Sequence, residues 1–221
     1  MKNKCRHLIV SADVYYTSAM PTPSLTPARL RKSGLGAFFR PRDIEPLGIS
    51  FLDLKRLVAE GAVEKVGPGL YRLAAAKPDE LETIAMVASA IPAGIVCLLS
   101  ALRIHNIGTQ APHEVWLALD RKARKPSRPP ARLRTVRFSG AMLTYGIQDR
   151  SILGVRVRVT SPARTVVDCF RYRHKLGLDV ALEALQEAIR ARVASVDEIM
   201  RAAEVCRART VMRTYLEALS P

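Results

Sequence analysis

Residues 39–73 read FRPRDIEPLGISFLDLKRLVAEGAVEKVGPGLYRL, and this stretch decides the fold of the N-terminal part. Ser50 is a favoured helix N-cap, and Asp53 three residues later approximates a capping box. Apolar residues then recur at helical spacing, at Leu54, Leu57 and Val58. The pattern predicts a helix that begins after Ser50, has one apolar face and ends at Gly61.

The neighbouring segments predict a recognisable order of elements. The expected elements are one part of a first helix at 28–33, a short helix at 41–47, and a hairpin of strands 62–66 and 70–73. Gly48 would allow a tight turn between the two later helices. Helix, turn, helix and hairpin in this order predict a winged helix, whose last helix would enter the DNA major groove. A small packing module without a DNA role is the alternative.

The rest of the chain predicts a larger mixed domain, so the fold class is α+β with an N-terminal winged helix-turn-helix. Residues 1–27 contain three prolines and predict a flexible arm, and 28–75 would be the DNA-binding domain. Beyond a linker at 74–77, the second domain would cover 78–221. Its expected elements are a helix from Pro78 to about Ile91, strands at 95–98, 114–119, 133–138 and 155–159, a helix at 100–106, and helices at 161–173, 178–192, 196–206 and 208–219.

The segment Thr160–Asp168 predicts a well-formed helix start. Ser161 can cap it, and Pro162 suits its first position. Arg164 and Asp168 are four residues apart, so their side chains could pair along one face.

The charge of the chain favours a polyanionic partner. The net charge is +15, and the sequence pI is about 10.3. Residues 121–137 hold 8 Lys and Arg and no acid, whereas 176–221 hold 6 basic and 7 acidic residues. In a soluble cytoplasmic protein the expected polyanion is nucleic acid, although general solubility would also explain the charge. This basic segment could contact nucleic acid, could be a solvated loop, or could dock an acidic partner protein. Its candidate contact residues are Arg121, Lys122, Arg124, Lys125 and Arg128.

No motif predicts catalysis, a metal or a cofactor. The phosphate-binding glycine motifs are absent, and no serine lies in a nucleophile context. The cysteines and histidines lack metal-ligand spacing. Asp120 follows a strand but has no second acid nearby, as a metal-dependent nuclease would need. No apolar run of roughly 18 residues occurs, so we expect a cytoplasmic protein without a membrane partner.

Two segments resemble the AbiEi-type antitoxins of abortive-infection systems. The first runs from Phe39 through Ser50 to Leu73, with Gly69-Leu70-Tyr71-Arg72-Leu73 as its distinctive end. The second comprises Ser100-Ala101-Leu102 with His105, the strand Val115–Leu119, and Val157–Asp168. The resemblance covers about residues 28–219.

This resemblance implies a regulator that is not an enzyme. Its winged helix would bind double-stranded DNA at inverted repeats in its own promoter and repress the operon. Its second domain would counteract a nucleotidyltransferase-like toxin in a type IV arrangement, without a stable complex. The alternatives are a phage-defence nuclease that cleaves DNA with a metal, or a protein-interaction module that does not bind DNA.

The candidate DNA contacts lie on the predicted winged helix: Arg40, Arg42, Ser50, Lys55, Arg56, Lys65 and Arg72. Lys55 and Arg56 are on the helix that would enter the groove, and Arg40, Arg42 and Arg72 would contact phosphates. Similar proteins often have polar residues after the helix serine, but Phe51 and Leu52 stand here. This difference argues against base reading by hydrogen bonds from the first turn.

Overall fold

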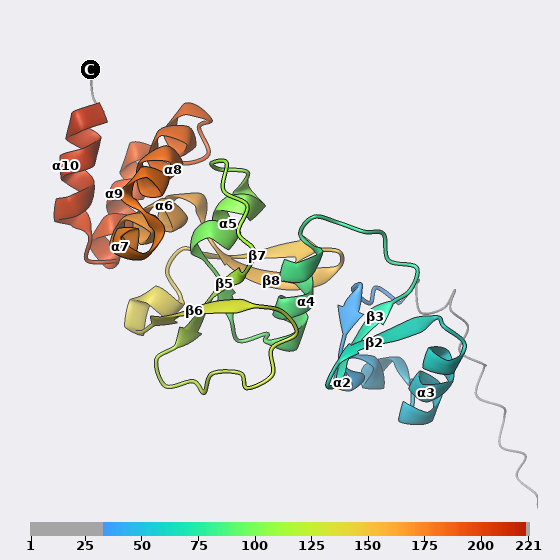
Figure 1. Cartoon of the computed structure of the whole chain (residues 1–221). Coiled ribbons are helices and arrows are strands. Elements are labelled where there is room, and N and C mark those ends of the chain that lie inside the picture. Colours follow the sequence, from blue (N-terminus) through green and yellow to red (C-terminus); the bar gives the residue numbers. More distant parts are fainter. Residues whose placement is uncertain (1–32, 220–221) are drawn as a thin grey trace, which may run out of the picture.

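The computed structural model describes residues 33–219, which form a mixed α+β fold with two separate sheets (Figure 1). The fold class predicted from the sequence is therefore confirmed at this level. The predicted arm at 1–27 and the predicted helix at 28–33, apart from Ser33, lie outside the described residues.

The N-terminal part is built around a three-stranded antiparallel sheet. Its elements are β1 (Phe38–Phe39), α2 (Pro41–Ile44), η1 (Glu45–Leu47), α3 (Phe51–Ala59), β2 (Val63–Gly67) and β3 (Leu70–Leu73). The strand order is β1-β3-β2. Leu54 and Leu57 of α3 pack into a small core with Phe39 and Tyr71, whose rings stack 5.9 Å apart. The predicted helices and hairpin are thus present, and β1 is an additional strand.

The C-terminal part contains a five-stranded mixed sheet in the order β6-β5-β4-β8-β7. Its first elements are α4 (Glu82–Ala90), β4 (Ile95–Val96), α5 (Leu98–His105), β5 (Val115–Asp120), β6 (Leu133–Phe138), η2 (Gly140–Leu143), β7 (Ile147–Ile152) and β8 (Val155–Thr160). Helices follow: α6 (Pro162–Arg171), α7 (Arg173–Leu176), α8 (Leu178–Arg190), α9 (Val196–Val205) and α10 (Arg209–Leu219).

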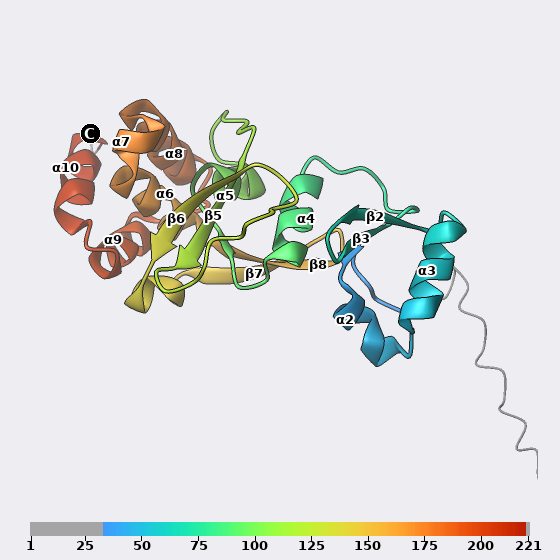
Figure 2. The same cartoon turned by 60° about the horizontal axis from the view of Figure 1, so that its bottom comes forward.

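The five-stranded sheet is covered on both faces, and strand β5 shows how. Its side chains alternate between the faces, as the two-residue period of a strand requires. Val115, Leu117 and Leu119 pack in the cluster that contains α4, whereas Trp116 and Ala118 pack in the cluster of α5, α6 and the later helices. Figures 1 and 2 show that α4 lies between the two sheets. They also show α6–α10 at the end of the molecule away from the N-terminal sheet.

Several predicted boundaries in this part were wrong. Strand β7 was not predicted; it pairs with β8 through the two-residue turn Leu153-Gly154, where both φ angles are positive. This is the geometry of a tight hairpin turn. The helix expected from Pro78 begins at Glu82, because the Asp79 carboxylate accepts a hydrogen bond from the Leu81 N–H and holds a turn there. The expected strand at 95–98 ends at Val96, and α5 already begins at Leu98.

The two parts contact each other closely at the β7–β8 turn. The Ala37 N–H donates to the Leu153 carbonyl at 2.7 Å. A Cβ built on Gly36 would lie 2.8 Å from the Gly154 carbonyl group, so the two backbones meet where neither residue has a side chain. Ala37 and Phe38 also share a buried cluster with Ile152 and Val155. The N-terminal part is therefore packed against the β7–β8 hairpin and α4.

Candidate nucleic-acid interface

The N-terminus of α3 is held by a complete capping box. Ser50 Oγ accepts from the Asp53 N–H at 3.1 Å and donates to Asp53 Oδ2 at 2.7 Å, while the Ser50 N–H donates to the same carboxylate. These hydrogen bonds from Ser50 lower the pKa of Asp53. The cap predicted from the sequence is confirmed. It also engages the Ser50 hydroxyl, which the sequence suggested as a DNA contact.

The outer face of α3 combines apolar and basic side chains. Leu54 and Leu57 point inward, so Phe51 and Leu52 face solvent with 56% and 75% of their surface exposed. Lys55 lies one turn after Phe51, with its Nζ 5.1 Å from the centre of that ring. Arg56 is exposed but lies within 3.6 Å of Asp53 and 3.7 Å of Glu60. Lys55 and Arg56 are thus brought together on the surface expected to meet DNA.

The two arginines before and in α2 have different surroundings. Arg40 is mostly buried and holds Asp43 through its N–H, Nε and Nη2. Arg42 is exposed, with its Nε 4.0 Å from the same carboxylate. Arg42 is therefore free to reach a phosphate, whereas Arg40 orders the first turn of α2.

The hairpin residues also divide into one exposed and one engaged side chain. Lys65 is exposed on β2. The Arg72 side chain is only 16% exposed; it lies 2.8 Å from Glu82 and 3.8 Å from Glu64, and donates to the Ala76 carbonyl. Arg72 ties the end of the hairpin to the start of α4. Phosphate contact by Arg72 stays a prediction, but its geometry favours a role in joining the two parts.

The basic loop connects the parallel strands β5 and β6 on the C-terminal part. Arg121, Lys122, Arg124, Lys125 and Arg128 are all exposed. Within residues 33–219, no acidic side chain lies in ion-pair contact with any of these five. Arg137 shapes the loop by donating to the Asp120 and Ala123 carbonyls at 2.8 and 2.7 Å. The loop is therefore fixed by Arg137 and presents positive charges that no acidic side chain of the described residues neutralises. This surface is separate from α3.

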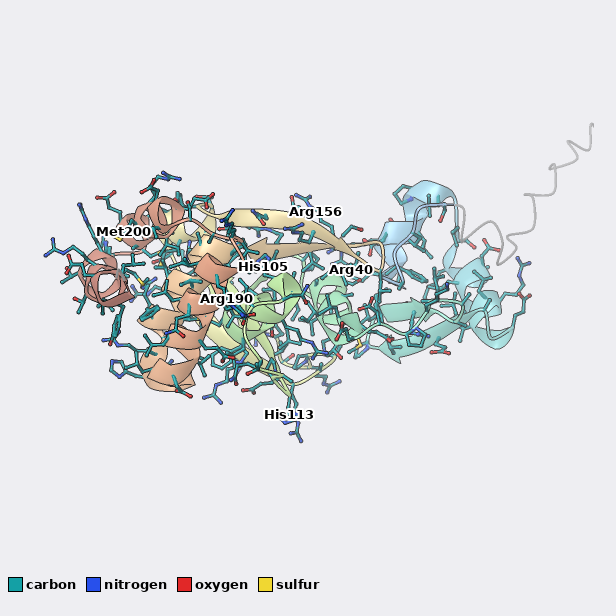
Figure 3. The ribbon with its side chains drawn as sticks, turned by 90° about the horizontal axis from the view of Figure 1, so that it is seen from above. Arg40, His105, His113, Arg156, Arg190 and Met200 are labelled. Atoms are coloured by element: carbon teal, nitrogen blue, oxygen red, sulfur yellow. The ribbon has the colours of Figure 1, made fainter. Side chains whose placement is uncertain are left out.

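Two further arginines were not singled out from the sequence. Arg156 and Arg158 line a cleft of about 500 Å³ at the junction of the two parts, together with Arg40 and Asp43. Figure 3 shows Arg40 and Arg156 near this junction. Arg156 pairs with Asp149 at 2.7 Å, and Arg158 donates to the Ala93 and Leu143 carbonyls. The alternation of valine and arginine in β8 was the available signal.

The predicted pair in the Thr160–Asp168 segment forms inside the C-terminal part. Arg164 Nε donates to Asp168 Oδ2 at 2.9 Å, and both side chains are fully buried. Burial raises the pKa of Asp168 to about 6, against the lowering effects of Arg164 and Arg171. Arg164 also donates to the Tyr145 carbonyl and lies over the Phe138 ring. The pair links α6 to the segment before β7.

The described residues hold no group of three or more His, Cys, Asp or Glu side chains arranged to bind a metal. Over the same residues, no helix is both long and apolar enough to span a membrane. Cys97, Cys169 and Cys206 are buried free thiols.

The comparisons with known proteins support the resemblance at the N-terminal part. Residues 33–74 match the family described as "Transcriptional regulator, AbiEi antitoxin", which confirms the resemblance over that segment. The RV2827C protein from Mycobacterium tuberculosis has a similar crystal structure, with a TM-score of 0.55 and 11% identity. The similarity covers 86% of this chain and 75% of that one, and it shows a shared fold. No curated protein matches the sequence.

Proposed function

We propose that this chain is a DNA-binding antitoxin that represses transcription of its own operon and has no enzymatic activity. The observation that carries the proposal is the outer face of α3, which presents Lys55 and Arg56 on a helix fixed by its cap and core. The match of residues 33–74 to AbiEi antitoxin regulators supports the regulatory role.

The N-terminal part would act as a winged helix. Helix α3 would lie in the major groove, and the β2–β3 hairpin would be the wing that follows the DNA backbone. Lys65 on that hairpin and Arg42 in α2 are exposed and would contact phosphates. In this proposal residues 28–75 are the DNA-binding domain and 78–221 the antitoxin domain.

The target would be double-stranded DNA with inverted repeats in the promoter of the chain's own gene. An inverted repeat presents two equal half-sites, so two protomers would bind with their α3 helices in successive major grooves. The exposed basic loop would add phosphate contacts on the same duplex or on another nucleic acid.

The antitoxin domain would counteract a nucleotidyltransferase-like toxin in the cytoplasm without a stable complex. The resemblance of the two C-terminal segments to AbiEi-type antitoxins supports this part of the proposal. Within that domain, the segment 176–221 holds 6 basic and 7 acidic residues, so it is less suited to phosphate contact than the basic loop is.

A gel-shift titration of the full chain tests DNA recognition. The probes are the DNA upstream of its gene and a scrambled duplex of equal length, at low and physiological salt. We expect tighter binding to the upstream DNA and a steep fall in affinity with salt. The variant Lys55→Ala/Arg56→Ala should lose the preference and lower the logarithmic salt slope by roughly 1–2.

A matched variant controls for loss of charge alone. Arg190→Ala/Arg213→Ala also removes two exposed positive charges, from α8 and α10 at the far end of the molecule. It should keep the preference for upstream DNA. Equal binding to both duplexes by the unmodified chain would reject sequence-specific repression. Cleavage of the probe on addition of Mg²⁺ would instead favour a nuclease.

A further inference from the structure

We propose that Phe51 and Leu52 recognise thymine, by packing against the C5-methyl groups that thymine presents in the major groove. This inference rests on the proposed function and specifies how the first turn of α3 would select its DNA sequence. The ligand is thus a duplex with thymines at the positions that the start of α3 reaches.

The first argument is that the fold forces these two side chains outward. A helix turns by about 100° per residue, so neighbouring positions are spread around its axis. Leu54 and Leu57 occupy the inward side and are almost fully buried, which leaves Phe51 and Leu52 on the outer side. Leu52, at 75%, is the most exposed large apolar side chain among those that the structure describes.

The second argument is that the polar groups of this turn are already engaged. The Ser50 hydroxyl donates to Asp53 and accepts from the Asp53 N–H, so its hydrogen-bonding capacity is largely used within the cap. The Asp53 carboxylate also accepts from the Ser50 N–H. The side chains of the first turn that remain available to a base edge are therefore apolar.

The third argument concerns which base edge fits this surface. In the major groove only thymine presents a methyl group; guanine and adenine present acceptors or donors, and cytosine presents an amino group. A phenyl ring and an isobutyl group can bury that methyl but cannot satisfy a donor or acceptor. An apolar first turn therefore favours thymine, whose methyl group it can bury, over guanine, adenine and cytosine, whose polar groups it would desolvate.

The surroundings of these side chains fit a nucleic acid better than a protein. Lys55 and Arg56 lie one turn further along the same outer face, four residues after Phe51 and Leu52 respectively. Lys55 is held against the Phe51 ring, where it can reach a base acceptor or a phosphate beside the methyl contact. An apolar pair bordered by cations matches the methyl groups and phosphates of a duplex.

The test compares thymine with uracil in the DNA. The upstream duplex is synthesised in two forms, with thymine or with deoxyuridine throughout, which removes the methyl groups but keeps the base-pairing edge. Burying one methyl group is worth about a fourfold change in affinity. The unmodified chain should therefore bind the uracil duplex roughly 4–15-fold more weakly, for one or two methyl contacts.

Variants assign this loss to the two residues. Phe51→Ala/Leu52→Ala should bind the thymine duplex more weakly than the unmodified chain does and should no longer distinguish it from the uracil duplex. Leu52→Ala alone should lose part of the discrimination while leaving the Phe51–Lys55 contact intact. Leu178→Ala, which truncates an exposed leucine on α8, should keep full discrimination. Thermal melting confirms that each variant is folded, and the comparison of the two duplexes on the unmodified chain needs no variant.

The failures of the two proposals are distinguishable. Preference for upstream over scrambled DNA with equal binding of thymine and uracil duplexes would overturn thymine recognition and leave the repressor proposal standing. An equal loss on uracil DNA for the unmodified chain and the double alanine variant would also overturn it, because the effect would come from DNA shape. Absence of any preference for upstream DNA would overturn both proposals. Unchanged DNA binding by the double variant, with lost protection against the toxin, would assign the apolar pair to protein docking instead.

Discussion

The substitution Asp168→Asn should destabilise the folded chain strongly while hardly changing its shape. Asparagine has nearly the same volume as aspartate but carries no charge, so the positive charge of Arg164 would remain buried without a counter-ion. The Arg164 and Asp168 side chains have 0% exposure, and their Nε and Oδ2 atoms are 2.9 Å apart. The only other cation near this carboxylate in the described part of the chain is Arg171, 3.8 Å from Oδ1 and 29% exposed.

The expected cost follows from this burial. Removing one member of a buried ion pair costs about 3–5 kcal/mol, since the remaining charge loses its partner in a medium where water cannot replace it. Burial also raises the pKa of Asp168, so desolvation already opposes its ionised form and the expected cost is at the low end of this range. Arg164 Nη2 has no hydrogen-bond partner among the described residues, so the guanidinium has no spare contact to offset the loss. Replacing both residues, as in Arg164→Met/Asp168→Leu, removes the buried charges together. That variant should lose only about 1–2 kcal/mol, mainly the hydrogen bond to the Tyr145 carbonyl.

Urea unfolding of the full chain at pH 7.5 measures these costs, because Asp168 is ionised well above a pKa of about 6. Glu204→Gln is the control: its pair with Arg209 is 2.7 Å long but more than 60% exposed on both sides, so its loss should cost no more than about 1 kcal/mol. The reasoning is refuted if Asp168→Asn costs as little as Glu204→Gln, or if the double replacement is less stable than Asp168→Asn alone.

Three further outcomes are expected. Ser50→Ala removes the α3 cap and should lower the free energy of unfolding by about 1 kcal/mol in urea titrations; Ser50→Thr, which can still cap, should recover most of it. Burial lowers the pKa of His105, so the unfolded chain takes up a proton that the folded chain excludes, and stability should fall as the pH drops through the usual histidine range. His105→Gln should flatten that part of the pH profile of stability; an unchanged slope would reject the assignment. Gly36→Ala should force the two parts apart and speed hydrogen exchange at the Ala37 amide, whereas Gly67→Ala, where a Cβ would meet no atom closer than 3.9 Å, should leave that exchange rate unchanged.

The local elements could be predicted because their signals are local. The Ser50 cap with its apolar spacing predicted α3, and Ser161-Pro162 predicted the start of α6. The pairing of Arg164 with Asp168 followed from a spacing of four residues on one helix. In each case the partners lie within one turn of each other, so the sequence spacing already determines their geometry.

The additional strands depend on partners that are distant in sequence. Strand β1 is only Phe38–Phe39, and it forms because it pairs with Arg72 and Tyr71 at the far end of the N-terminal part. Strand β7 reads IQDRSI, which is polar apart from its ends, since only Ile152 is buried and four of its six residues are exposed. An edge strand of this kind lacks the alternation by which a half-buried strand is recognised. Its pairing with β8 stabilises it instead.

The sequence also does not show which basic side chains are already paired with acids. Counting arginines and lysines therefore overstates the positive charge that is available to DNA. The Arg40 guanidinium pairs with Asp43, and the Arg72 guanidinium pairs with Glu64 and Glu82. Contact of either arginine with a phosphate would break interactions that hold α2 or the junction with α4. Lys55 and Lys65 face solvent and meet no acidic side chain in the described residues. The phosphate contacts of the N-terminal part should therefore come chiefly from its lysines and Arg42. Sequence preference would come from the outer face of α3, where Lys55 and Arg56 border the apolar surface of the first turn.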